Sequence, residues 1–70
     1  MTAYERAKQL ADINQKDDQD WTYKVQPIVE GDNTIGHEVA IFNENDQFEG
    51  ILKRFYNDGK EALPPLAVVS

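Results

Sequence analysis

The sequence predicts a small α+β domain in which one N-terminal helix packs on a three-stranded antiparallel meander, followed by a short extended segment at the C-terminus. Three observations predict this fold. Residues 2–15 carry small apolar side chains at helical spacing, residues 21–56 contain three runs with strand-like patterns, and short turn-forming sequences separate the runs. The 70 residues have room for a single domain, so we assign residues 1–70 to it.

The helix over residues 2–15 opens with a capping box. Thr2 and Glu5 are three positions apart, so the hydroxyl of one and the carboxylate of the other can each accept a backbone amide proton. The stripe expected to face the sheet is built from small residues around one larger anchor and consists of Ala3, Ala7, Leu10, Ala11 and Asn14. We expect the helix to contact the sheet through Ala7, Leu10 and Ala11.

A polar loop over residues 15–20 leads into the first strand, residues 21–29. Trp21, Tyr23 and Val25 alternate there with polar residues, which is the period of a half-buried strand. Pro27 has no amide proton to donate, so this strand is expected at a sheet edge or bulged near its end.

The second strand is predicted over residues 34–42, after a turn at Glu30–Asn33. Ile35, His37, Val39 and Ile41 share one face of it, and Ala40 and Phe42 share the other. Gly36 inside the run predicts a bulge.

The third strand is predicted over residues 48–56, after a turn at Asn43–Asp46. Its apolar residues also fit a helix, but a strand continues the hairpin rhythm and is favoured. Strict alternation then places Leu52 on the face opposite to Ile51 and Phe55.

The C-terminal residues follow a turn at Asn57–Gly59. We expect residues 60–63 to form one helical turn, which Pro64-Pro65 cannot continue. Leu66–Ser70 is then either a docked short strand or a loose tail.

The net charge of −6 disfavours direct binding to nucleic acid and to anionic lipid. The chain contains no cysteine, which removes thiolate and disulfide chemistry. It also contains no apolar run of about 20 residues and no secretory signal, so we expect a cytoplasmic protein that does not bind membranes. A small phage or bacterial accessory protein is consistent with these features.

No residue pattern for catalysis stands out. His37 is the only histidine and Ser70 the only serine, so the chain lacks the partners of a nucleophilic triad. The acidic loops at residues 17–20 and 43–49 do not fit a calcium loop, because Trp21 and Thr22 follow the first where further ligands and the glycine should begin, and Phe48 takes the place of the glycine in the second. The four glycines do not form a phosphate-binding motif. We therefore expect no enzymatic activity, no cofactor and no specific metal site.

Apolar residues occur on both faces of the predicted strands, whereas one helix covers one face only. The candidate interaction surface consists of aromatic residues of the sheet, namely Trp21, Tyr23, Phe42, Phe55 and Tyr56. Two function classes fit. The first is a non-enzymatic module that binds a protein or a second copy of itself, by strand addition at a sheet edge. The second is an acidic inhibitor that mimics nucleic acid; clustering of the acids in turns favours the first class.

Overall fold

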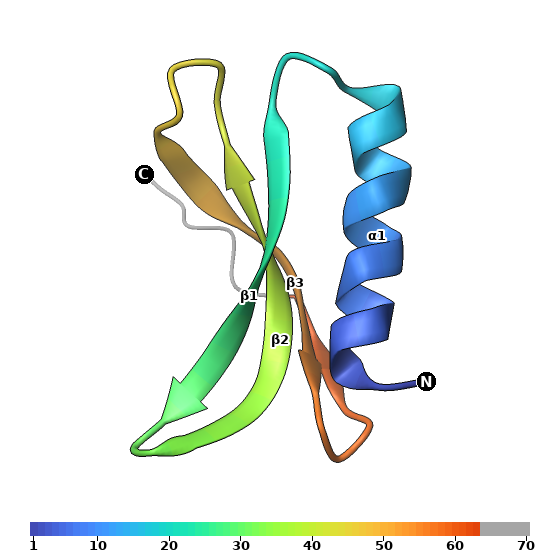
Figure 1. The fold of residues 1–70 in the computed structure, drawn as a ribbon, viewed down its shortest axis with the longest axis vertical. Coiled ribbons are helices and arrows are strands. Elements are labelled where there is room, and N and C mark those ends of the chain that lie inside the picture. Colours follow the sequence, from blue (N-terminus) through green and yellow to red (C-terminus); the bar gives the residue numbers. More distant parts are fainter. Residues whose placement is uncertain (64–70) are drawn as a thin grey trace.

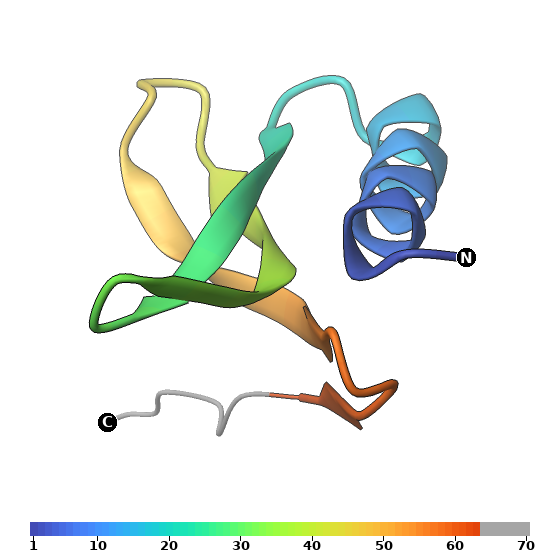
Figure 2. The same cartoon turned by 60° about the horizontal axis from the view of Figure 1, so that its bottom comes forward.

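The structure is a computed structural model and describes residues 1–63. Its elements follow one another as α1 (Ala3–Asp17), β1 (Thr22–Glu30), β2 (Asn33–Phe42), β3 (Phe48–Tyr56) and β4 (Glu61–Ala62). The strands form one antiparallel sheet in the order β1-β2-β3-β4 (Figure 1). Helix α1 lies on one side of this strongly twisted sheet (Figure 2). The α+β prediction is confirmed, including a strand over residues 48–56, and β4 is an addition to it.

Helix α1 begins with the predicted capping box. The Thr2 hydroxyl accepts the Glu5 amide proton at 3.1 Å, and the Thr2 amide donates to Glu5 Oε1 at 2.9 Å. The hydrogen bond from the Thr2 backbone lowers the pKa of Glu5. The helix ends at Asp17, two residues later than predicted, and the Asp18 amide still donates to the Asn14 carbonyl at 3.0 Å.

The edge strand β1 shows why Pro27 is tolerated. Only one side of an edge strand pairs within the sheet, so a missing amide proton need not break the ladder. The predicted bulge is present one residue before Gly36, because Ile28 and Val29 pair with Gly36 and Thr34 and skip Ile35. Gly36 itself is required by close strand contact, since a Cβ at this position would collide with the Phe55 carbonyl and lie 2.9 Å from Tyr56 Cα.

Strand β3 carries two further bulges, and one of them overturns a predicted facing. Val39 pairs with Lys53 and Ala40 pairs with Ile51, so Leu52 is an extra residue between them. Leu52 consequently packs against the same core cluster as Phe55, on the helix side of the sheet. Strict alternation had placed Leu52 opposite Phe55, and this prediction was wrong because a bulge resets the alternation.

The core between α1 and the sheet is thin. Its buried members are Ala3, Ala7, Ala11, Val39 and Phe55, and the partly buried Leu10, Tyr23, Val25 and Leu52 pack around them. The predicted helix contact through Ala7, Leu10 and Ala11 is confirmed. Leu10, however, lies at the margin of the core, and the largest fully buried side chain among residues 1–63 is Val39.

Residues 60–63 do not form the predicted helical turn. Glu61 and Ala62 instead form β4, which pairs with Phe55 and Arg54. Gly59 adopts a positive φ of 93°, and the Tyr56 amide donates to the Lys60 carbonyl at 2.8 Å, so the chain reverses in a tight hairpin. The predicted helical turn was wrong because the pairing with β3 is non-local, and the local sequence does not specify it. The prediction for Leu66–Ser70 lies outside the described residues.

Candidate association surface

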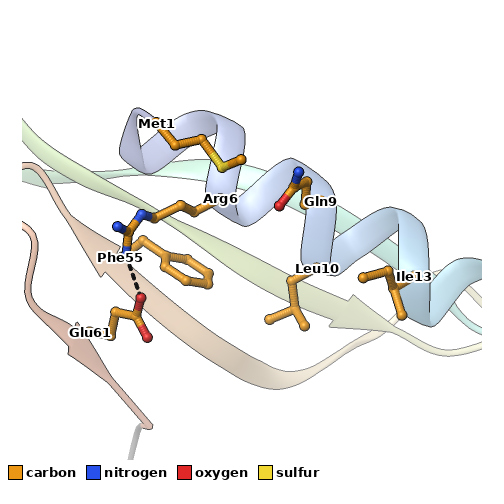
Figure 3. A pocket seen from close by; sticks show the side chains of 7 residues that line it. All are labelled: Met1, Arg6, Gln9, Leu10, Ile13, Phe55 and Glu61. Carbon is orange, nitrogen blue, oxygen red and sulfur yellow. Dashed lines mark hydrogen bonds and ion pairs between the residues drawn. The ribbon is translucent and has the colours of Figure 1, made fainter.

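A groove runs along the side of α1 that faces the β3–β4 hairpin (Figure 3). It has a volume of about 430 Å³ and is lined by Met1, Arg6, Gln9, Leu10, Ile13, Phe55 and Glu61. Leu10 and Ile13 project from α1 towards the groove, and Phe55 forms part of its floor. Two of the apolar side chains that line the groove are largely exposed to solvent, Met1 at 74% and Ile13 at 60%.

The groove follows from the way α1 meets the sheet. The three alanines occupy the contact stripe, so the helix backbone lies close to the strands and the larger Leu10 and Ile13 fall on the flank. Among residues 1–63 the sheet is short on that flank, because β4 pairs there with Arg54 and Phe55 alone. Within residues 1–63, the edge of β3 from Phe48 to Lys53 therefore has no partner strand on its outer side.

One end of the groove is closed by charged side chains. Arg6 Nη1 lies 2.6 Å from Glu61 Oε2, and Lys53 Nζ lies 2.8 Å from Glu61 Oε1. The hydrogen bond from Lys53, reinforced by the one from Arg6, lowers the pKa of Glu61. Lys53 Nζ also lies 5.3 Å from the centre of the Phe55 ring. These exposed contacts add little stability individually, but they tie β4 to both α1 and β3.

The face of the sheet that α1 leaves uncovered is largely polar at its centre. Glu38 is only 8% exposed and accepts hydrogen bonds from Gln26 Nε2 at 2.5 Å and Arg54 Nε at 2.9 Å. The bond to Glu38 raises the pKa of Arg54. Towards one end of this face, Phe42 and Phe48 stack edge to face with ring centres 5.7 Å apart. The satisfied charge pair makes this face a poor candidate for a large apolar interface.

The five aromatic residues selected from the sequence do not share one surface. Phe55 is 6% exposed in the core, and Tyr23 packs against that core while its hydroxyl contacts Asp18. The strand register places Phe42 and Tyr56 on the opposite side of the sheet. Trp21 precedes β1, and its carbonyl accepts a hydrogen bond from the Gln15 side chain.

The groove residues Met1 and Ile13 were not among the selected site residues. Ile13 is three positions after Leu10, so both lie on one side of the helix. This spacing is the feature of the sequence that could have identified Ile13 as a groove residue. The sequence alone could not show that, among residues 1–63, β4 leaves Met1 and Ile13 uncovered.

His37 lies in β2, the strand in which the sequence placed it; it is half-buried and lies on the side of the sheet that faces α1. Its ring meets Tyr4 edge to face with centres 5.4 Å apart, and its Nδ1 is buried without a hydrogen-bond partner among the described residues. The acidic loops are ordered by their own side chains: Asp18 Oδ1 accepts the Asp20 amide proton and Asn43 Oδ1 accepts that of Gln47. In the described part of the chain, no three acidic or histidine side chains are placed to hold a metal ion.

Comparison with family models, curated proteins and solved structures finds no match to this chain. Across residues 1–63, no helix combines the length and apolar character needed to span a membrane.

Proposed function

We propose that this protein is a non-enzymatic association module of the cytoplasm that binds another protein chain through the groove beside α1. The observation that carries the proposal is the exposure of Ile13 at 60%, next to the partly buried Leu10, in a groove of about 430 Å³. Exposed aliphatic side chains that line a groove beside the core are typical of surfaces that become covered on association.

The thin core supports the same proposal. Small domains often gain stability from a partner chain, because their own core hides little apolar surface. Here three of the five residues in the buried core cluster are alanines. A partner that covered the exposed 60% of Ile13 would contribute on the order of 1–2 kcal/mol from that side chain.

The positions of the carboxylates favour association over mimicry of nucleic acid. The α1–β1 and β2–β3 connections lie at one end of the sheet and the β1–β2 turn lies at the other (Figure 1). The first two contain Asp20 and Asp46, and the third contains Asp32. A mimic of nucleic acid is expected to array carboxylates along one continuous face.

A site-specific photo-cross-linker tests the proposal. Ile13→p-benzoylphenylalanine is expected to give one stoichiometric adduct in the cells that naturally make the protein, identified by mass spectrometry as a single species. The same substitution at Asn33, an exposed residue at the β1–β2 turn, is the matched control. Equal adducts from both positions, or none from position 13, would refute a groove-based association.

A further inference from the structure

We infer that the outer edge of β1 is closed to strand addition by two features, the side-chain amide of Gln15 at the start of the strand and Pro27 near its end. A sheet edge is where a further chain can add a strand, because the backbone groups on its outer side have no partner. Strand β1 is an edge strand of nine residues, and its sequence is rich in β-branched side chains, which favour pairing. An edge of this kind needs protection.

Gln15 makes the hydrogen bonds that a neighbouring strand would otherwise make at the start of β1. Its Nε2 donates to the Trp21 carbonyl at 2.7 Å, and its Oε1 accepts the Tyr23 amide proton at 3.0 Å. Nε2 also donates to the Asp18 carbonyl at 3.1 Å, which holds the side chain in place. A primary amide offers both a donor and an acceptor, as a backbone peptide group does. Both backbone groups are therefore paired by α1 and cannot pair with an incoming strand.

The bond from Tyr23 also shows which amide positions of β1 point outwards. In an antiparallel pair, successive residues direct their backbone groups alternately towards the partner strand and away from it. The register of β1 with β2 is regular over residues 22–28. Since the Tyr23 amide bonds to Gln15 and so points away from β2, the amide positions of Val25 and Pro27 point away from β2 as well.

Pro27 therefore removes a donor from the outer edge and none from the ladder with β2. Three amide positions point outwards over residues 23–27. Gln15 pairs the first, at Tyr23, and Pro27 has no amide proton at the third. Val25 alone keeps a donor for an added strand, and one donor is too few to form a ladder.

The opposite edge of the sheet is protected in a different way. Leu52 and Glu49 are extra residues in the pairing of β3 with β2, and such bulges twist an edge away from flat pairing. Strand β4 covers Arg54 and Phe55. Side-chain contacts in the groove, and not strand addition, are then the way in which a partner binds. This consequence rests on the proposed function, whereas the closure of β1 does not.

Amide hydrogen exchange of Gln15→Met tests the first feature. Methionine is similar to glutamine in helix propensity but has no amide group. The Tyr23 amide should exchange about tenfold faster than in the wild type, while the Lys24 amide, which points towards β2, keeps its rate. Gln19→Met makes the same change at an exposed residue of the α1–β1 connection and should leave the Tyr23 rate unchanged. Equal Tyr23 rates in the two variants would overturn the role of Gln15.

Removal of both features tests the closure of the edge. Gln15→Met/Pro27→Val frees the Tyr23 donor and adds one at position 27, on either side of Val25. In sedimentation velocity, this variant should associate at concentrations about tenfold lower than Gln19→Met/Thr22→Val, which introduces the same two side chains without adding an outward donor. The Val25 amide should become protected from exchange as the protein concentration rises, which locates the contact at the β1 edge.

Circular dichroism separates strand addition from unfolding. If Gln15→Met/Pro27→Val does not fold, Pro27→Val alone, at an exposed position, still adds a donor beside Val25 and should show stronger association than Thr22→Val alone, with protection of the Val25 amide. A folded variant that associates no more than its control, or associates without protecting the Val25 amide, would overturn the closure of the β1 edge. None of these results depends on the groove, so failure of the inference and failure of the proposed function are distinguishable.

Discussion

The replacement Ala7→Leu tests whether the alanine stripe sets the distance between α1 and the sheet. Ala7 is 0% exposed and belongs to the buried cluster that contains Val39 and Phe55. Leucine adds three carbon atoms where the helix lies against the strands, so α1 must move outwards or neighbouring side chains must leave their preferred rotamers. Overpacking of this kind costs roughly 1–3 kcal/mol. Alanine and leucine have similar helix propensities, so the loss would come from packing.

A loss of this size is large for a domain of 70 residues, whose total stability is about 3.5–10 kcal/mol. Urea denaturation followed by the fluorescence of Trp21, the single tryptophan, measures it. With a slope of about 1 kcal/mol per molar urea, the midpoint should fall by about 1–3 M. Lys16→Leu, at an exposed position of the same helix, should change stability by no more than about 0.5 kcal/mol. An Ala7→Leu midpoint equal to that of the wild type would refute the close packing of α1 on the sheet.

Three further changes have defined outcomes. Leu10→Ala should lower the free energy of unfolding, measured by urea denaturation, by roughly 1–3 kcal/mol. This is less than for a fully buried leucine, because Leu10 lies at the core margin; a loss above about 4 kcal/mol would place Leu10 inside the core. Gly36→Ala should destabilise the protein strongly, because its Cβ would meet the backbone of β3, and amide exchange along β2 should accelerate; unchanged exchange would contradict the close strand contact. Glu61→Gln tests the ion pairs of β4. Because folding lowers the pKa of Glu61, the stability that its ionised carboxylate contributes is present above about pH 4.5. That stability is lost as the pH falls through the lowered pKa of the folded protein. The wild type should therefore exceed Glu61→Gln in stability at pH 7 but not at pH 2, and a gap that persists at pH 2 would argue against the charge effect.

The features that local patterns specify were predictable from the sequence. The capping box of Thr2 and Glu5 fixes the start of α1 through contacts three residues apart. The alternation in β1 and the turns that follow each strand define the meander. The alanine stripe identified the side of α1 that contacts the sheet, because small residues at helical spacing permit close approach.

The features that depend on non-local pairing were not predictable. The β4 strand exists because Glu61 and Ala62 pair with β3 and because Glu61 meets Arg6, which is 55 positions away in the sequence. The bulge at Leu52 depends on how β3 registers against β2. The groove depends on both, since its floor and its closed end come from β3 and β4, and a selection of sheet aromatics therefore missed Ile13.

Binding of the partner captured at position 13 to Ile13→Gln and to Val29→Gln tests most directly the claim that the groove beside α1 is an association surface. Both side chains are β-branched and open, at 60% and 58% exposure, but Val29 lies at the far end of β1 and outside the groove. Ile13→Gln should weaken binding of the partner chain by about tenfold, because the groove loses an apolar side chain, whereas Val29→Gln should leave the dissociation constant unchanged. Equal dissociation constants for the two variants would contradict the account.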